Sequence, residues 1–263
     1  MILSLLKKAV PVPKIEALDS FLFVGPHPDD IEVACGGTVA KLASSGKKIT
    51  FLIVTNGCVG SVDENLQGEE LVRVRREEAL QSAKMLNVSD VRFLPYNDGN
   101  DYDFSKVMHD VVKVMLEVRP QMVFCPDYTV PSECHPDHLN VGKIVTESVF
   151  RAGWKQLTAR LGLIGNLSDV NIAYYYTHKP NCYVGVRKTS VLHLEAIACH
   201  KSQFTKNDLK SFKLYFTLRE IRFGLRCCKG RAEGFRVLSP HPTALFPRGF
   251  GVLKSPFACK SAL

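Results

Sequence analysis

The chain has 263 residues, of which 46% are hydrophobic and 23% are charged, which is the composition of an ordinary globular protein. Disordered, collagen-like and low-complexity classes are therefore excluded, and the length favours one sizeable domain or a domain with an extension. The 34 Lys and Arg residues outnumber the 26 Asp and Glu residues, and the formal net charge of +8 leaves nucleic acid, an anionic membrane surface and an anionic substrate open as partners.

Membrane-spanning and exported classes find no support in the sequence. No apolar run approaches the ~20 residues that cross a bilayer, and residues 1–8 lack the regions of a signal peptide. The nine cysteines form no Cys-x-x-Cys pair and sit mostly in apolar stretches, which favours reduced thiols used as small hydrophobic side chains. We therefore expect a cytoplasmic protein without a transmembrane segment.

Short apolar runs alternate with segments of helical spacing along the first two thirds of the chain. The expected strands are residues 21–24, 49–54, 91–94, 121–124 and 172–176. The expected helices are residues 37–45, 69–86, 104–118 and 139–150. Nearly uninterrupted apolar strands are typical of a parallel sheet buried on both faces. The pattern predicts an α/β fold, Rossmann-like and doubly wound, with a mostly parallel sheet and helices on both faces.

The last third of the chain has a different character. Residues 151–170 give mixed signals and carry no prediction, whereas helices are expected after the apolar run 183–186, at about 190–203 and 207–226. A coil-rich tail should follow, with Pro240, Pro242, Pro247 and Pro256. Because no repeat or linker is apparent, we predict a single domain over residues 1–263, with a core of about 18–186 and a basic C-terminal elaboration of about 187–263.

The positive charge belongs to that elaboration. Residues 187–236 contain twelve bases and four acids, residues 237–263 add three bases and no acid, and residues 1–186 carry a net charge of −3. A mildly acidic core beside a basic region suits a small-molecule substrate that carries a phosphate or a carboxylate. No nucleic-acid-binding signature accompanies the charge, so no nucleic-acid partner is expected.

One basic segment leaves an alternative open. Leu209, Phe212, Phe216 and Leu218 are interleaved with lysines and arginines, as in an amphipathic helix that lies on a membrane surface. The same pattern is typical of a helix that packs its apolar stripe on the sheet and exposes its bases to solvent. A non-enzymatic module that binds an anionic surface and a peripheral membrane contact therefore stay open as alternatives. A homo-oligomer is also open.

Polar residues follow each of the first four predicted strands, where an open α/β sheet binds its ligands. Gly25-Pro-His27-Pro-Asp29-Asp30 follows the first strand, and Thr55-Asn-Gly follows the second. Asn97-Asp98-Gly99 follows the third, and Asp127 and then Cys134-His135-Pro-Asp137-His138 follow the fourth.

Two of these segments have the spacing of metal ligands. His27 and Asp30, at i and i+3, can converge on one cation while Asp29 points elsewhere, and His135 and His138 repeat the spacing. One ligand from the second pair would complete two nitrogens and one oxygen, the set of a catalytic Zn²⁺ that keeps a position for water. Either motif alone can also be a capped turn. A two-metal phosphoesterase is disfavoured because few carboxylates flank the histidines.

The same two segments resemble the motifs of the N-acetylglucosaminyl-phosphatidylinositol deacetylase family, also called LmbE-like or PIG-L-like. The similar stretches are Gly25-Pro-His-Pro-Asp-Asp-Ile-Glu-Val-Ala-Cys-Gly-Gly-Thr38 and His135-Pro-Asp-His-Leu-Asn-Val-Gly142, and weaker similarities extend over about residues 20–236. The resemblance implies a zinc-dependent hydrolase that removes the N-acetyl group from an N-acetylglucosamine conjugate. Zinc as against Fe²⁺ or another divalent ion stays open.

The resemblance also implies a role for each residue of the motifs. It makes His27, Asp30 and His138 the zinc ligands, and Asp29 the general base that takes a proton from the attacking water. Protonated His135 would stabilise the oxyanion or protonate the departing amine, and Asp137 would orient His135. These groups fit what amide hydrolysis needs, namely an activated water, a charge sink and a proton for the leaving nitrogen.

Three further residues are candidates for substrate binding. Arg75 matches a family position that faces the substrate, with a solvated helix face as the alternative. Asp98 and Asp127 lie at strand ends, where they can hold sugar hydroxyls or histidines or simply stabilise turns. His200 is expected to be structural. The chain departs from many relatives at Cys58, where they carry an acidic residue.

Overall fold

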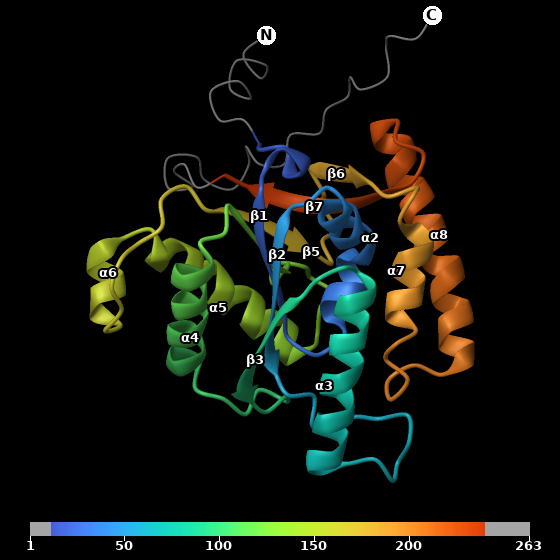
Figure 1. The fold of residues 1–263 in the computed structure, drawn as a ribbon, viewed down its shortest axis with the longest axis horizontal. Coiled ribbons are helices and arrows are strands. Elements are labelled where there is room, and N and C mark those ends of the chain that lie inside the picture. Colours follow the sequence, from blue (N-terminus) through green and yellow to red (C-terminus); the bar gives the residue numbers. More distant parts are fainter. Residues whose placement is uncertain (1–11, 240–263) are drawn as a thin grey trace, which may run out of the picture.

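The computed structural model describes residues 12–239, and its centre is a sheet with the strand order β3-β2-β1-β4-β5-β7-β6 (Figure 1). The strands are β1 (Ser20–Gly25), β2 (Lys48–Thr55), β3 (Asp90–Tyr96), β4 (Met122–Pro126), β5 (Asn171–Tyr175), β6 (Cys182–Gly185) and β7 (Ala232–Leu238). The helices are η1 (Ile15–Ala17), α2 (Asp30–Ser44), α3 (Gly68–Met85), α4 (Phe104–Val118), α5 (Pro136–Ala152), α6 (Lys155–Arg160), α7 (Ser190–Ile197) and α8 (Lys206–Cys227). The proline-rich tail and Cys259 lie outside the described residues.

The first five strands run parallel, which confirms the predicted mostly parallel sheet. β1 pairs with β2 on one side and β4 on the other, β2 continues to β3, and β4 continues to β5. β7, which pairs antiparallel with both β5 and β6, lies where the sequence predicted coil. Its residues are held as a strand by these two distant partners, and polar Glu233 and Arg236 within it weaken the local strand signal.

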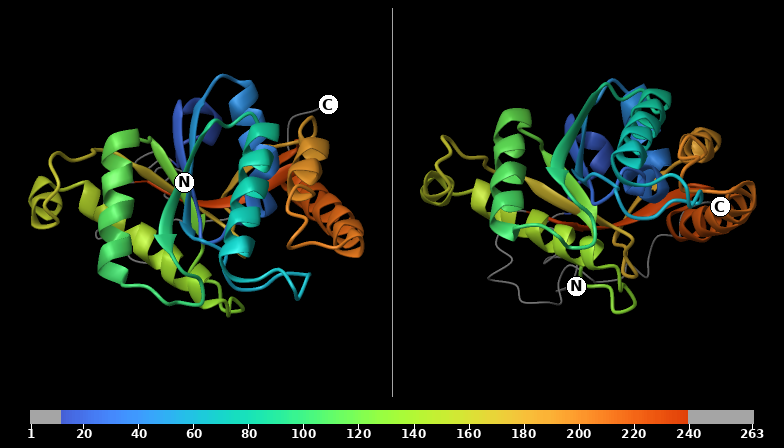
Figure 2. Two further views of the ribbon diagram at one scale, coloured as in Figure 1. Left: turned by 60° about the horizontal axis from the view of Figure 1, so that its bottom comes forward. Right: turned by 90° about the horizontal axis from the view of Figure 1, so that it is seen from below.

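Helices cover both faces of the sheet, as the doubly wound fold requires (Figure 2). Alternate side chains of β1 serve the two cores, since Phe21 and Phe23 face one and Leu22 and Val24 face the other. The Phe side includes residues of α2, α3 and α7, and the Leu and Val side includes residues of α4 and α5. α8 packs against β7. This arrangement buries both faces of the central strands.

The helix α2 begins at Asp30, seven residues before the expected start, and is interrupted near its first turn. Cys35 has non-helical angles of φ −145° and ψ 20°, so two helical segments meet there. Glu233 of β7 accepts hydrogen bonds from the backbone N–H groups of Gly37 (3.0 Å) and Thr38 (2.8 Å), which caps the second segment. A Cβ at Gly37 would lie 2.8 Å from Glu233 Oε1, so glycine makes room for this cap.

The break in α2 is supported by a wholly buried polar group. His193 Nδ1 lies 3.3 Å from Glu220 Oε1 and 3.5 Å from Glu233 Oε1, and Ser190 donates to the other oxygen of Glu220. A Cβ at Gly36 would meet the His193 ring at 2.7 Å. The adjacent glycines of the first motif therefore serve close packing of α2 against α7 and β7.

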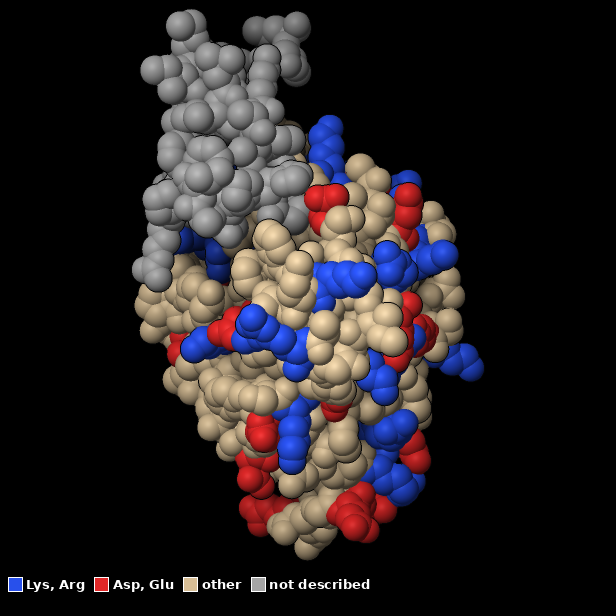
Figure 3. Space-filling view, turned by 90° about the vertical axis from the view of Figure 1, so that its left-hand side faces the viewer, with Lys and Arg blue, Asp and Glu red and all other residues tan. Residues whose placement is uncertain are grey.

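Charge is distributed unevenly over the surface. Lys, Arg, Asp and Glu are intermixed on the face of α4, α5 and α6 (Figure 3), whereas α8, with its many bases, lies at the opposite side of the molecule (Figure 1). Within residues 12–239, no helix combines the length and the apolar character needed to cross a bilayer.

Strand order reverses between β1 and β4, and the crevice beyond the carboxyl ends of these strands is the expected ligand site.

Candidate active site

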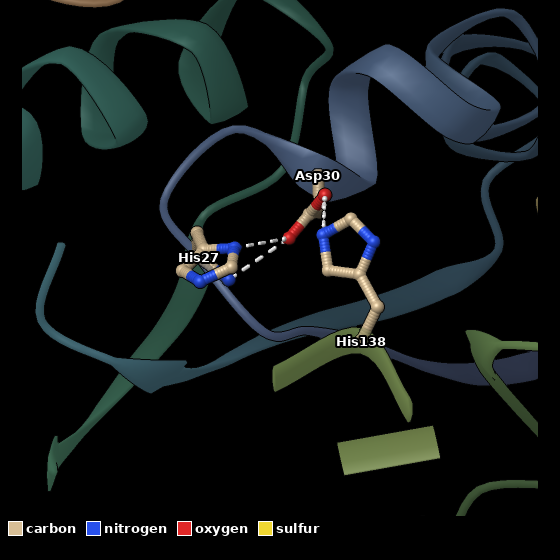
Figure 4. Close-up of side chains that lie close together, drawn as sticks. All are labelled: His27, Asp30 and His138. Atoms are coloured by element: carbon tan, nitrogen blue, oxygen red, sulfur yellow. Dashed lines mark hydrogen bonds and ion pairs between the residues drawn. The ribbon is translucent and has the colours of Figure 1, made fainter. Parts of the chain in front are cut away.

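His27 and Asp30 meet where β1 turns into α2 (Figure 4). His27 Nδ1 lies 3.1 Å from Asp30 Oδ2, and the same oxygen accepts the His27 backbone N–H at 3.0 Å. Both residues are buried, and Pro26 and Pro28 flank the histidine. The i, i+3 spacing thus brings an imidazole nitrogen and a carboxylate to one point, as the sequence predicted.

His138 reaches the same carboxylate from across the crevice, from the first turn of α5. Its Nε2 atom lies 3.2 Å from Asp30 Oδ1, while its Nδ1 atom lies 3.1 Å from Glu133 Oε2. Pro136 occupies the first turn of α5, where a missing backbone N–H costs nothing. Ligand atoms of His27, Asp30 and His138 all lie within 4.8 Å of one another.

The donor atoms and the surrounding carboxylates of this cluster suit a divalent metal ion. Burial lowers the pKa of His27, but hydrogen bonds to Asp137 and Asp30 outweigh it and raise the pKa to about 10. The pKa of His138 is likewise lowered by burial and raised overall to about 9 by Asp30 and Glu133. The carboxylates around the two imidazoles therefore favour positive charge at this point. Two imidazoles and a carboxylate are also the donors of a catalytic zinc site.

Asp137 contacts His27 at the ring nitrogen that does not face Asp30. Its buried carboxylate lies 3.1 Å from His27 Nε2 and accepts the backbone N–H groups of Gly99 and Asn100, each at 2.8 Å, and the hydroxyl of Tyr102 at 3.0 Å. Burial raises the pKa of Asp137, but these donors outweigh it and hold the carboxyl ionised. An ionised carboxylate on the second nitrogen fixes the orientation of His27 and leaves Nδ1 for Asp30 or an ion.

His135 lies next to the cluster and is more exposed than His27. Its Nδ1 atom accepts the backbone N–H of Asp137 at 3.3 Å, whereas its distance to the Asp137 carboxylate is 3.9 Å. In the neutral ring the proton is therefore on Nε2. Burial and the nearby charges of His27 and His138 lower the pKa of His135. Asp137 thus contacts His135 through its backbone and His27 through its carboxylate.

Asp29 contacts Arg75 of α3 and lines the same cavity as His27 and Asp30. Its Oδ2 atom lies 3.2 Å from Arg75 Nη2, and Arg75 also donates to the carbonyl of Gly57 at 3.2 Å. Burial raises the pKa of Asp29, and the positive charge of Arg75, which lowers it, offsets this effect only in part. Arg75 is buried, so the alternative that it lies on a solvent-exposed helix face is wrong. Arg73 does lie on the exposed face of this helix, where it pairs with Glu70 and Glu77.

Asp98 and Asp127 have different surroundings. Asp98 accepts the backbone N–H groups of Cys58 (2.7 Å) and Val59 (3.1 Å), so it holds the loop after β2 at the edge of the site. Asp127 forms an ion pair with Arg236 and accepts the hydroxyls of Thr129 and Thr177. The structure therefore brings Asp98 to the cavity of the histidines, whereas Asp127 is engaged away from it; substrate binding by either residue stays a prediction.

Sequence reasoning missed two residues that contact the cluster. Glu133 accepts from the His135 backbone N–H at 2.9 Å and lies beside His138, yet it precedes the motif with no distinguishing signal. Tyr176 donates its hydroxyl to Asp30 Oδ1 at 3.2 Å. Tyr176 follows β5, so the rule that ligands meet the carboxyl ends of strands could have identified it.

Two cavities open at the cluster and share the side chains of His138 and Tyr176. The smaller, of about 360 Å³, is lined by residues that include His27, Asp29, Arg75, Asp98 and His135. The larger, of about 610 Å³, extends between the loop that contains Glu133 and helix α8. The two cavities therefore adjoin at His138 and Tyr176.

Comparison with known proteins finds relatives of the chain. The family model described as "PIG-L: GlcNAc-PI de-N-acetylase" matches residues 22–149. The diacetylchitobiose deacetylase of Thermococcus kodakarensis is 34% identical over 82% of this chain and 82% of its own length. A 1D-myo-inositol 2-acetamido-2-deoxy-alpha-D-glucopyranoside deacetylase of Kineococcus radiotolerans is 28% identical over 52% of this chain and 47% of its own length.

A solved structure is similar over nearly the whole chain. It is the N,N'-diacetylchitobiose deacetylase of Pyrococcus horikoshii in complex with an inhibitor, with a TM-score of 0.82 and 32% identity. The match covers 89% of this chain and 90% of that chain. The similarity therefore extends well beyond the two histidine motifs.

Proposed function

Since this chain belongs to the GlcNAc-PI de-N-acetylase family and is a deacetylase, we propose that His27, Asp30 and His138 hold a zinc ion for hydrolysis of an N-acetylglucosamine conjugate. The convergence of their ligand atoms within 4.8 Å at the reversal of strand order carries this proposal. Zinc is favoured by two imidazoles and one carboxylate, and Fe²⁺ or another divalent ion accepts the same donors.

The residues around the ion have complementary tasks in amide hydrolysis. His27, Asp30 and His138 would hold a divalent ion here, which would lower the pKa of water and polarise the acetamide carbonyl. Asp29, in the same cavity, takes the proton of the attacking water, and Arg75 at 3.2 Å holds its carboxylate in position. His135 lines the same cavity, and in its protonated form it would donate to the developing oxyanion and pass a proton to the departing nitrogen. Asp137 and Glu133 orient the two histidine ligands.

We propose a small-molecule amino sugar conjugate with an anionic group as the substrate. Two relatives are named for deacetylation of diacetylchitobiose and of an inositol glycoside of the same amino sugar, which supports the N-acetylglucosamine part. The anionic part is supported by the bases of α8, because Arg219 and Arg222 line the larger cavity. A basic wall raises the local concentration of anionic substrates.

A panel of N-acetylglucosamine conjugates tests the proposal. Metal-loaded protein is incubated with free N-acetylglucosamine, its disaccharide, an inositol glycoside and phosphate-bearing conjugates, and acetate is measured. Acetate release from at least one conjugate is expected, with the free amine as the second product. Failure to release acetate from any member, with metal bound, would contradict it. Phosphate release from the phosphate-bearing members would favour the phosphoesterase alternative.

Helix α8 supports a peripheral membrane contact as a second candidate role. Phe216, Glu220 and Gly224 are buried, as for a helix packed on the sheet, yet a second apolar row is exposed. That row is Leu214, Leu218, Ile221 and Leu225. Arg222 and Arg226 are exposed nearby on the same helix. Salt-sensitive sedimentation with anionic vesicles, and none with neutral vesicles, is the expected result for such a contact.

A further inference from the structure

We propose that the 610 Å³ cavity is the subsite for the group attached to the amino sugar, and that Arg219 binds an oxyanion of that group, a phosphate or a carboxylate. The inference rests on the proposed function, since it assumes that the acetamido sugar occupies the smaller cavity. It adds a specificity-determining residue on α8 to the groups that carry out the reaction.

The position of the larger cavity fits a subsite for an attached group. It shares His138 and Tyr176 with the smaller cavity, so one molecule can occupy both while its amide lies beside the histidines. Its opposite wall is formed by α8 through Tyr215, Leu218, Arg219, Arg222 and Phe223. The volume of about 610 Å³ accommodates a substituent as large as a second sugar.

Arg219 is a partly buried cation without a carboxylate partner among the described residues. None of the ion pairs among residues 12–239 involves it, whereas Arg75 pairs with Asp29 and Arg236 pairs with Asp127. Its Nη2 atom donates to the carbonyl of Ala34 at 3.3 Å, and its Nε atom is buried without a hydrogen-bond partner. Since a guanidinium has five N–H donors and Nη2 donates to Ala34, Arg219 keeps further donors for an anion.

The guanidinium of Arg219 is also fixed in place before any ligand binds. Its central carbon lies 4.7 Å from the ring centroid of Phe216 and 5.6 Å from that of Tyr215. Aromatic contacts and the bond to Ala34 restrict the side chain, so little conformational entropy is lost when an anion binds. A guanidinium recognises phosphate and carboxylate oxygens with two parallel donors.

The other charges of the cavity determine where the anion lies. Glu133 is the acidic residue of the lining and stands beside His138 at the catalytic end, where it repels an oxyanion. Arg222 lies one turn from Arg219 at the α8 end and adds a second positive charge. The anionic group is therefore expected at the α8 end, with the neutral sugar between it and the histidines.

Substitution of Arg219 tests the inference through a ratio of specificity constants. The conjugates are the anomeric phosphate of N-acetylglucosamine, its glycoside with a hydroxy acid, and the neutral methyl glycoside. In Arg219→Met, kcat/KM for the anionic conjugates relative to the neutral one should fall about 10- to 100-fold, as expected for loss of a charge-assisted hydrogen bond. Arg219→Lys should restore part of the ratio. Arg226→Met, an exposed base outside the cavity lining, should keep it.

The outcomes separate the inference from the proposed function. Deacetylation of the conjugates with the same ratio in wild type and Arg219→Met would overturn the role of Arg219 and leave the proposed function intact. If only one anionic conjugate depends on Arg219, the cavity selects phosphate or carboxylate accordingly. Calorimetric binding of the anionic conjugates decides the point independently of turnover, because equal affinity in the two proteins would also overturn the inference.

Discussion

The carboxylate of Asp137 contacts His27 Nε2 at 3.1 Å, although the two residues are 110 positions apart in the chain. This bond joins the segment after β1 to the first turn of α5, and so connects the two sides of the crevice. Asp137 can hold His27 firmly because Gly99, Asn100 and Tyr102 hold the carboxylate in turn. The geometry of the proposed metal site therefore depends on a residue that is not itself a proposed ligand.

Asp137→Asn is expected to weaken metal binding about 10- to 100-fold, since carboxylates behind ligating histidines have effects of this size. Competition with a chelator of known affinity measures the change. The fold should persist, because the amide retains an acceptor for part of the network. Unchanged affinity for Zn²⁺ would show that the bond to His27 is not used to orient a ligand.

Asp29→Asn is expected to keep the metal and to lose activity by about 100- to 10,000-fold, the usual contribution of a general base. Asp29 faces Arg75 rather than the proposed ligands, so its loss leaves the ligand set complete. Metal content and acetate release are measured on one sample of the variant. A fully active variant would mean that another group takes the proton.

Asp127→Asn is expected to destabilise the protein by about 3–5 kcal/mol at neutral pH, because it leaves the partly buried guanidinium of Arg236 without its counter-charge. Burial raises the pKa of Asp127, but hydrogen bonds from Arg236, Thr177 and Thr129 outweigh it and lower the pKa to about 2.

A carboxyl whose pKa is lowered by folding stabilises the native state above its unfolded pKa of about 4 and loses that effect as the pH falls toward its folded value. The difference in unfolding free energy between wild type and Asp127→Asn should therefore shrink between about pH 4 and pH 2. Urea unfolding at several pH values measures it. A difference that is constant over this range would contradict the role of the ion pair.

Glu233→Gln is expected to cost about 1.5–3 kcal/mol, the contribution of hydrogen bonds to a charged group, because Glu233 caps the break in α2. Since the first segment of α2 carries Asp30, metal affinity should fall as well. Glu195→Gln, an exposed residue of α7, serves as the matched control and should change neither quantity. Equal stability of the two variants would show that the cap contributes little.

The sequence predicted the first five strands because each is an apolar run between turn residues, a local signal. It placed the start of α2 too late, because the segment before Gly37 is helical only up to a break that Glu233, almost 200 residues away, stabilises. The strand β7 was missed for a similar reason. Both of its partners, β5 and β6, are separated from it in the sequence by the helices α7 and α8.

The candidate site divides in the same way. His27, Asp30 and His138 stand in short motifs whose spacing is visible in the sequence, and the structure brings them together. The burial of Arg75 depends on how α3 lies against the loop of Gly57, which residue spacing does not encode. Apart from its position next to the second histidine motif, nothing in the sequence distinguishes Glu133 as a site residue. The long-range bond between Asp137 and His27 became apparent only from the fold.

Titration of Zn²⁺ into metal-free protein, with acetate release from an N-acetylglucosamine conjugate measured at each step, tests the central claim most directly. Activity should be absent without metal, rise in proportion to added zinc and reach its maximum at one ion per chain. Acetate release that persists in the metal-free protein, or that begins only when a second ion binds, would contradict a single metal site formed by His27, Asp30 and His138.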